Sequence, residues 1–292
     1  MPKKVDIENS FLSKVYLPVI KKMKLSVVIQ VMNKLNYTKQ CLSDLTQQTC
    51  KELEIIIIDN ASTDGTKNYL ENIKGIKVLT NKENKGCAAS WNQGVKESTG
   101  EWVIILNNDV RIPRNCFDLL ISSAISMKID VISPGMREGE LNYNHAEYAL
   151  SYTKKMKDVF RRCTPSGVCF ALKKDLFCKI GLFDENFYIG QYEDADFFRR
   201  CKLLKLTMGI TGKSFIHHFG STTQKQIKEN SSENYSLKNR EYHRKKWKIG
   251  FFKRHIERYR DQLMTLFWSK KEYYRHGHSI LEKFDGISIN YY

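Results

Sequence analysis

The segment Leu53–Asp59 constrains the fold more than any other part of the sequence, because it holds four consecutive isoleucines. Such a run fills both faces of a short strand with apolar side chains, as in the centre of a parallel sheet. Further strand-like runs occur at Leu25–Val31, Ile76–Thr80 and Trp102–Leu106. Helix-like stretches separate them, at Tyr37–Thr49, Gly65–Ile73 and Cys87–Ser98. This alternation predicts an α/β fold, Rossmann-like, with a mostly parallel central sheet flanked by helices.

The second half of the chain has a less regular pattern. We expect helices at Pro113–Met127, Lys174–Ile180 and Tyr192–Leu206, and strand-like pieces at Asp130–Ser133, Gly167–Leu172 and, as the last short strands, Thr207–His218. The segment 135–162 is polar and irregular, and we expect a mobile loop there.

Positive charge is concentrated near the C-terminus. The chain of 292 residues has 48 Lys and Arg against 32 Asp and Glu, a net charge of +16. Residues 225–292 contain 16 basic and 8 acidic side chains and so carry +8, half of the excess. In this segment Phe252, Ile256, Tyr259, Leu263 and Leu266 recur at helical spacing. We therefore divide the chain into an N-terminal extension (1–23), a main domain (24–224) and a basic helical extension (225–292).

Short apolar runs and scattered cysteines bear on the compartment. No apolar run is long enough to span a membrane, and the N-terminus does not resemble a secretory signal. The eight cysteines form no CxxC pair, which favours reduced thiols. We expect a cytoplasmic protein.

Polar clusters follow three of the predicted strands. Asp59-Asn60 ends the second strand, Asn84-Lys-Gly86 follows the third and Asn107-Asn-Asp109 ends the fourth. Ligands of open α/β sheets bind at the carboxyl ends of the strands, so these clusters are expected to meet. Carboxylates there can bind a nucleobase or ribose, or hold a divalent cation beside a diphosphate. The sequence contains neither a GxGxxG after the first strand nor a GxxxxGK[ST] motif, which argues against dinucleotide-binding and P-loop proteins.

These clusters, in order, resemble the nucleotide-binding half of the GT-A glycosyltransferases of family 2. Later motifs resemble the bacterial rhamnosyltransferase-like branch of that family, and the resemblance covers roughly residues 24–223. The motifs are Gly167-Val-Cys-Phe-Ala-Leu, Gly181-Leu-Phe-Asp-Glu, Tyr192-Glu-Asp-Ala-Asp196 and His217-His-Phe-Gly-Ser. The resemblance implies transfer of a sugar from a nucleoside-diphosphate-sugar donor to a hydroxyl of a glycan or lipid-linked acceptor, with inversion, in the synthesis of a cell-envelope polysaccharide.

The resemblance also implies roles for individual residues. Asp194 is the expected catalytic base, with Glu193 as the alternative, and Asp109 and His217 are the expected ligands of a divalent cation, Mn²⁺ or Mg²⁺. The expected nucleotide-sugar-binding residues are Gln30, Asn33, Asp59, Asn60, Asn84, Lys85, Gly86, Asn92 and Asn108. Two departures are visible: the first strand ends in Gln30-Val-Met-Asn33 where the family has Pro-Thr-Tyr-Asn, and the DXD motif retains one carboxylate, Asp109.

Other interpretations of the sequence remain open at this point. A protein that binds sugar nucleotides without turnover is one, and a nucleic-acid-binding protein is another, although the concentration of charge in the extension argues against the latter. The extension places aromatic residues among basic ones, as at Trp247 and at Phe267-Trp268. This composition suits an anionic membrane surface, which would make the protein peripheral, but the apolar stripe can equally pack on the main domain.

Overall fold

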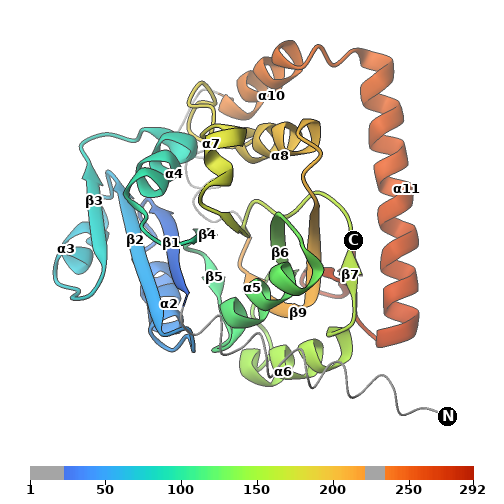
Figure 1. The fold of residues 1–292 in the computed structure, drawn as a ribbon, viewed down its shortest axis with the longest axis horizontal. Helices are drawn as coiled ribbons and strands as arrows, with labels where there is room; N and C mark the ends of the chain where they lie inside the picture. The colour runs from blue at the N-terminus through green and yellow to red at the C-terminus, as the bar shows by residue number, and fades with distance from the viewer. Residues whose placement is uncertain (1–22, 221–233) are drawn as a thin grey trace.

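The computed structural model describes residues 23–220 and 234–292, and its centre is one mixed sheet (Figure 1). The expected N-terminal extension lies almost wholly outside the described residues, as does the boundary at 224/225. Strands follow the order β11-β10-β6-β8-β4-β1-β2-β3, and β5, β7 and β9 join through further pairings. The predicted α/β class with a mostly parallel sheet is confirmed.

The first half of the chain forms the parallel part of this sheet. Its strands are β1 (Lys24–Val31), β2 (Glu52–Asn60), β3 (Lys77–Asn81) and β4 (Trp102–Asn107). The helices between them are α2 (Leu35–Thr46), α3 (Thr66–Glu71) and α4 (Gly86–Glu97). β1 lies between β2 and β4, and the carboxyl ends of all three strands lie at the same edge of the sheet.

The second half adds strands of mixed direction. β8 (Cys169–Lys173) is antiparallel to β4 and to β6 (Val131–Glu138), and β9 (Met208–His218) is parallel to β6. The short strands β5 (Val110–Arg111) and β7 (Phe160–Arg161) pair with β9. The helices are α5 (Cys116–Met127), α6 (His145–Met156), α7 (Leu176–Ile180) and α8 (Glu193–Leu203). The expected short strands of Thr207–His218 are therefore one long strand.

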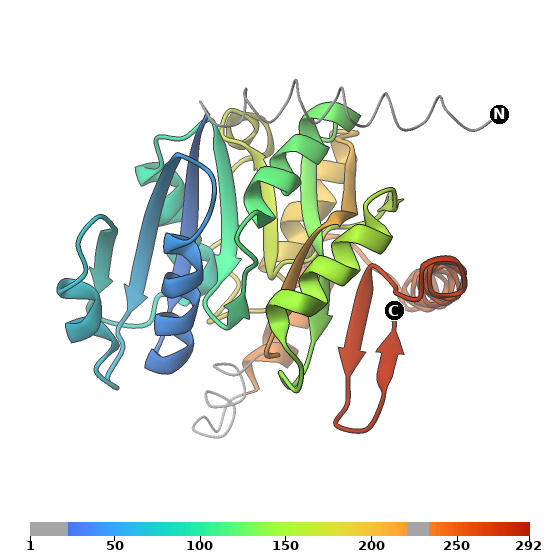
Figure 2. The ribbon, with the colours of Figure 1, turned by 90° about the horizontal axis from the view of Figure 1, so that it is seen from below.

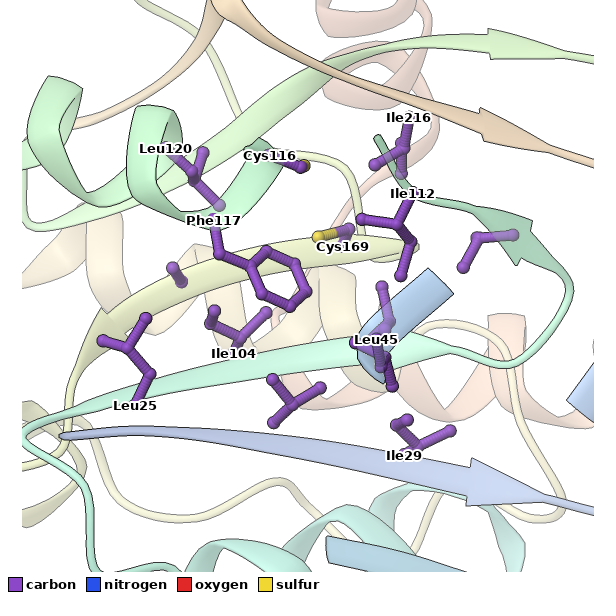
Figure 3. Packing of buried hydrophobic residues seen from close by; sticks show 14 of the residues in the cluster. Leu25, Ile29, Leu45, Ile104, Ile112, Cys116, Phe117, Leu120, Cys169 and Ile216 are labelled. Atoms are coloured by element: carbon purple, nitrogen blue, oxygen red, sulfur yellow. The ribbon is translucent and has the colours of Figure 1, made fainter. Parts of the chain in front are cut away.

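Both faces of the sheet are buried under helices. Ile55 and Ile57 of β2 belong to one hydrophobic cluster, and Ile56 and Ile58 belong to the other. Figure 3 shows the first cluster, where Phe117 of α5 lies against strand side chains such as Ile104. The isoleucine run thus does what its composition predicts, because successive strand side chains point to opposite faces.

The expectation of an irregular loop over 135–162 is wrong. β6 continues to Glu138, and α6 follows with Asn144 as its N-cap, whose side chain accepts hydrogen bonds from the amides of Ala146 and Glu147. Ala149, Tyr152 and Met156 are buried on one side of α6. The spacing of these three residues behind an Asn cap is a helix signal, which the polar residues between them obscured.

The C-terminal extension is helical, as expected, and ends in a hairpin that was not predicted. It consists of α10 (Tyr235–Lys246), α11 (Phe251–His276), β10 (Leu281–Phe284) and β11 (Ile289–Tyr291). β10 pairs with β6, and Figure 2 shows the hairpin beside α11, at the edge of the sheet opposite β3. Within the described ranges, no helix has the length and apolarity needed to cross a membrane.

Candidate active site

A cavity of about 500 Å³ opens where β1 and β4 end. One wall comes from the ends of these strands, with Gln30 and the run Asn107–Asp109. A second wall comes from the start of α4, and a third from the loop 189–192 with the first residues of α8. The cavity therefore lies at the sheet edge where the polar clusters were expected to meet.

Six of the expected site residues line this cavity: Gln30, Asn84, Asn108, Asp109, Glu193 and Asp194. Asp109 follows the end of β4, and Asp194 lies at the start of α8. The two residues are 85 positions apart in the sequence and line the same cavity. Asn108 is held in place by its side-chain amide, which donates to the hydroxyl of Thr38 over 3.0 Å. The walls thus combine three acidic groups, Asp109, Glu193 and Asp194, with amide side chains.

Asp59 and Asn60 lie behind the cavity rather than in its walls. The side-chain oxygen of Asn60 accepts a hydrogen bond from the backbone amide of Lys85 at 2.9 Å. The side-chain NH₂ group of Asn60 donates to the side-chain oxygen of Asn84. Asn60 thus orients Asn84. Asp59 is fully buried, and one of its oxygens accepts from the Ser62 amide at 3.1 Å. The expected contact of Asp59 with the nucleotide stays a prediction.

Asn33, Lys85, Gly86 and Asn92 are likewise outside the cavity walls. Asn33 accepts a hydrogen bond from the Thr63 amide at 2.7 Å and so joins the loops after β1 and β2. The buried Asn92 donates to the carbonyl oxygen of Phe183 and accepts from its amide, both over 2.9 Å. The Lys85 side chain is exposed.

Gly86 brings α4 close to the third wall of the cavity. It has φ of +84°, and a Cβ there would lie 3.2 Å from the backbone oxygen of Ile189. The next amide, of Cys87, donates to that oxygen over 2.7 Å. Gly86 is therefore needed for close packing of two backbones rather than for binding a ligand.

Glu193 and Asp194 are adjacent acidic residues that differ in their exposure. Glu193 is 4% exposed, and burial followed by the charge of Asp194 raises its pKa to about 8. Asp194 is half-buried, and one of its oxygens accepts from the Ala195 amide at 2.8 Å. Burial also raises the pKa of Asp194 above its ordinary value. Glu193 therefore holds a proton near neutral pH, and Asp194 is the more exposed of the two carboxyl groups.

Gly167 lies directly against Asp194. A Cβ at Gly167 would lie 2.1 Å from Oδ2 of Asp194, well inside contact distance. Because Gly167 has no side chain, the Asp194 carboxylate can occupy its position in the cavity wall.

His218 lies next to Asp109, in the place where the family resemblance led us to expect His217. Nε2 of His218 lies 3.3 Å from Oδ1 of Asp109, and its Nδ1 lies 3.3 Å from Glu138. Burial opposes the charged form of His218, but the two carboxylates outweigh it and raise its pKa to about 9. His217 points to the other face of β9, because adjacent strand residues alternate.

The surroundings of His217 are those of a structural residue. It is fully buried, and its Nδ1 lies 2.8 Å from the hydroxyl of Tyr143. Burial, together with nearby positive groups, lowers its pKa to about 3. The sequence motif His217-His218 contained both residues, and only the register of β9 decides which one faces the cavity.

Helix α10 holds the third wall in an unusual backbone conformation. Ile189, Gln191 and Tyr192 have φ of 61°, 75° and 74°, in the left-handed region. Asn239 of α10 is buried and accepts from the Tyr188 amide at 2.9 Å. Its NH₂ group donates to the carbonyl oxygens of Tyr188, Gly190 and Gln191. These bonds stabilise a loop that would otherwise be strained.

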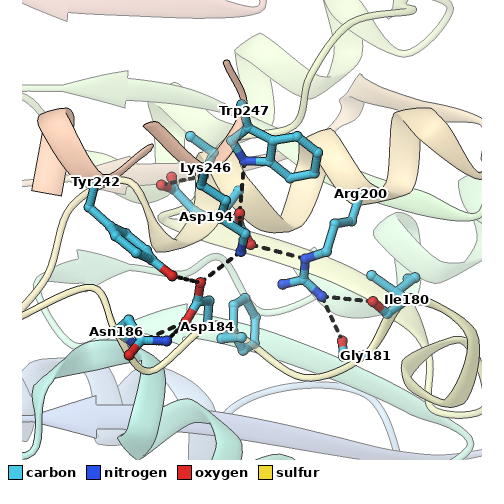
Figure 4. A network of polar contacts seen from close by, with 12 residues as sticks. Ile180, Gly181, Asp184, Asn186, Asp194, Arg200, Tyr242, Lys246 and Trp247 are labelled. Carbon is cyan, nitrogen blue, oxygen red and sulfur yellow. Dashed lines mark hydrogen bonds and ion pairs between the residues drawn. The ribbon is translucent and has the colours of Figure 1, made fainter. Parts of the chain in front are cut away.

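Further contacts from the C-terminal end of α10 fix the segment around this loop (Figure 4). Lys246 lies 2.7 Å from Asp184 and 2.6 Å from Asp196. The hydroxyl of Tyr242 donates to Asp184, and the indole of Trp247 donates to Asp196. Asn239 and this network could not be predicted from the sequence, because no local pattern links residues about 50 positions apart.

The cavity offers two protein ligands for a divalent cation. Asp109 could supply a carboxylate and His218 an imidazole, both of them buried, and the His218 ring would have to lose its proton to bind the ion. Across residues 23–220 and 234–292, no group of three or more His, Cys, Asp or Glu side chains is arranged around a common point. The two groups suit an ion that takes its remaining ligands from the phosphates of a substrate.

Comparison with known proteins identifies the family of this chain. The sequence model of "Glycosyl transferase family 2" matches residues 26–181, more than half of the chain. The uncharacterized glycosyltransferase RT0329 of Rickettsia typhi is 26% identical over 68% of this chain, and the match spans 65% of that protein. The GalNAc(5)-diNAcBac-PP-undecaprenol β-1,3-glucosyltransferase of Campylobacter jejuni is 25% identical over 71% of this chain and 74% of that protein.

A solved structure shows the same fold. The structure of GalNAc-T7 with UDP, GalNAc and Mn²⁺ superposes with a TM-score of 0.56 at 17% identity, covering 67% of this chain and 44% of that one. The sheet topology is that of the GT-A fold. From the family match over residues 26–181, the chain belongs to glycosyl transferase family 2.

Proposed function

We propose that this glycosyltransferase moves a sugar from a nucleoside-diphosphate-sugar to a hydroxyl of a glycan or lipid-linked acceptor, with inversion at the anomeric carbon. The observation that carries the proposal is the position of Asp109 and Asp194 in the walls of one cavity. The name of the Campylobacter jejuni relative contains a lipid-linked acceptor, undecaprenol, which supports that acceptor class.

In the proposed reaction, Asp194 accepts the proton of the acceptor hydroxyl. The hydroxyl oxygen attacks the anomeric carbon, and the bond from that carbon to the diphosphate oxygen breaks, so the nucleoside diphosphate leaves. Attack opposite to the leaving group inverts the configuration. A carboxylate near the anomeric carbon also stabilises the positive charge that develops there. Glu193 remains the alternative base, disfavoured because it holds its own proton near neutral pH.

Amide side chains and a cation are proposed to bind the donor. Gln30, Asn84 and Asn108 line the cavity and can hydrogen-bond to a nucleotide or a sugar. Asp109 and His218 would hold Mn²⁺ or Mg²⁺, an ion that offsets the charge gained by the leaving diphosphate when it is bound. We assign Asp59, Asn60, Asn92 and Gly86 to the support of these groups, in line with their burial.

A thermal-shift panel tests donor binding first. UDP-, dTDP- and GDP-sugars are added with and without Mn²⁺, and the true donor raises the melting temperature by mass action. Release of nucleoside diphosphate in the presence of an acceptor then tests turnover. Donor binding without release of nucleoside diphosphate in any of the acceptor mixtures would favour a sugar-nucleotide-binding protein. A rise in melting temperature with random oligonucleotides and with none of the sugar nucleotides would favour a nucleic-acid-binding protein.

We also propose a cytoplasmic protein that associates peripherally with the inner face of the membrane and acts in cell-envelope polysaccharide synthesis. All eight cysteines are free, five of them buried, which fits a reducing compartment. Measurement of the protein in membrane and soluble fractions of cells expressing the full chain would test the location.

A further inference from the structure

Helix α11 carries a row of apolar side chains that is exposed along its length. Phe252, Ile256, Tyr259, Leu263 and Phe267 are 80%, 68%, 65%, 49% and 57% exposed. Their spacing of three and four places them on one side of the helix. We call these five residues the outer stripe. Leu266, which the sequence pattern placed in this stripe, is 48% exposed as well. The stripe therefore does not pack on the main domain.

The opposite, polar side of α11 faces the body of the protein. Ser269 and Glu272 are 1% and 5% exposed. Glu272 pairs with the buried Arg161 at 2.7 Å and accepts from the amide of Ile280 at 2.8 Å. Surface helices ordinarily turn the apolar side inward, so α11 is oriented the other way round. Figure 1 shows α11 at the edge of the molecule.

Charges are distributed unevenly around the outer stripe. At 3.6 residues per turn, the exposed Arg260 and Lys270 and the half-buried Lys271 fall within about a quarter turn of the stripe. The three acidic residues of α11 fall on the other half, at Glu257, Asp261 and Glu272. The apolar surface is therefore bordered by positive charge, which fits an anionic partner.

Two observations favour a lipid surface over a second copy of the chain. In a symmetric pair the same basic residues would border the interface from both sides and repel each other. The stripe and its neighbours are also rich in aromatic rings, with Tyr273 and Tyr274 48% and 92% exposed beyond Phe267. Aromatic and basic residues together are typical of helices that lie in a membrane interface.

We propose that α11 docks on an anionic membrane, with the outer stripe inserted at the level of the headgroups and the bordering lysines and arginine on lipid phosphates. The first aromatic and basic cluster of the extension is not part of this surface, because Lys246 pairs with Asp184 and the indole of Trp247 donates to Asp196. This surface gives the peripheral location its structural basis and does not depend on the transfer reaction.

Flotation of the full-length protein with vesicles tests the proposal. Vesicles of phosphatidylcholine with phosphatidylglycerol should carry the protein at low salt, and those of phosphatidylcholine alone should carry much less. Leu263→Glu places a charge in the stripe and should weaken binding about tenfold or more, since it removes an inserted leucine. The matched control is Gln262→Glu, which makes the same charge at the exposed neighbouring position and should float nearly as the wild type.

Several results would overturn the proposal. One is a wild-type protein that stays with the soluble fraction at low salt, and another is equal flotation of the Leu263→Glu and Gln262→Glu variants. A wild-type dimer in light scattering that Leu263→Glu converts to a monomer, without flotation, would assign the stripe to a second copy. Donor-induced thermal shifts should be the same in all three proteins, so failure here leaves the proposed transfer reaction untouched.

Discussion

Nε2 of His218 lies 3.3 Å from Oδ1 of Asp109, and the other nitrogen of the same ring lies 3.3 Å from Glu138. Lys283 of the terminal hairpin in turn lies 2.9 Å from Glu138. The C-terminal extension therefore supports two walls of the cavity, the second being the loop that Asn239 holds. This connects the basic extension to the site as well as to the proposed membrane surface.

His218→Gln should raise the Mn²⁺ concentration needed for half-maximal turnover by roughly 10- to 100-fold, because one of two protein ligands is weakened. The measurement is a metal titration of nucleoside diphosphate release. His217→Gln serves as the control: it should lower the melting temperature through its buried position and leave the metal requirement unchanged. Equal metal curves for the wild type and His218→Gln would remove His218 from the proposed cation site.

Asp194→Asn should lower turnover by roughly a hundredfold or more and retain donor binding, since the amide cannot accept the proton. Turnover and the donor-induced thermal shift are measured on the same preparation. Glu97→Gln, an exposed acid on α4, is the control and should behave as the wild type. Turnover that survives in Asp194→Asn would transfer the role to another group, with Glu193 the first to test.

Gly167→Ala should reduce turnover with little effect on the secondary structure, because its methyl group would displace the Asp194 carboxylate. We expect a loss of about tenfold or more, as for small misplacements of a catalytic group. Gly250→Ala has nothing within 4 Å of the added methyl and is the matched control. Comparable activity of the two variants would show that the position of Asp194 is not set by Gly167.

Asn239→Ala should free the loop 188–192, because it removes the acceptor of the Tyr188 amide and three donated hydrogen bonds. A loss of about 1–3 kcal/mol is expected for such buried groups. Hydrogen exchange at the Tyr188 amide should become faster, and turnover should fall more than the lower stability explains. The control is Glu241→Ala, at an exposed position on the same helix, which should leave stability, hydrogen exchange at Tyr188 and turnover unchanged.

The pKa of Glu193 predicts a pH dependence of stability. The folded protein holds this proton up to about pH 8, whereas the unfolded chain loses it near its ordinary value of about 4.3. The folded state thus binds more protons between these values, and its stability from this group falls as pH rises through that window. Glu193→Gln removes the effect. The difference between the melting temperatures of the variant and the wild type should therefore shift in favour of the variant as pH rises from 5 to 8. A constant difference across this range would contradict the assignment.

Local patterns determined the framework of the fold. The isoleucine run of β2 specified a strand buried on both faces, and the spacing of polar clusters after β2, β3 and β4 located the cavity edge. These signals work because strand alternation and helical spacing depend on neighbours in the chain. The helix α6 was not predicted because polar residues such as Ser151, Lys154 and Lys155 lie between its buried residues and resemble a loop.

What the tertiary structure alone decided is the direction in which side chains point and the partners they meet. The family resemblance predicted that Asp59, Asp109 and Asp194 meet at one site. Asp109 and Asp194 line the cavity and Asp59 is buried behind it, and only the register of β9 places His218 rather than His217 beside Asp109. Only packing between distant segments brought Asn239 to the loop 188–192 and turned the apolar side of α11 outward. Such choices depend on contacts between residues far apart in the chain, and no local period of hydrophobicity carries that information.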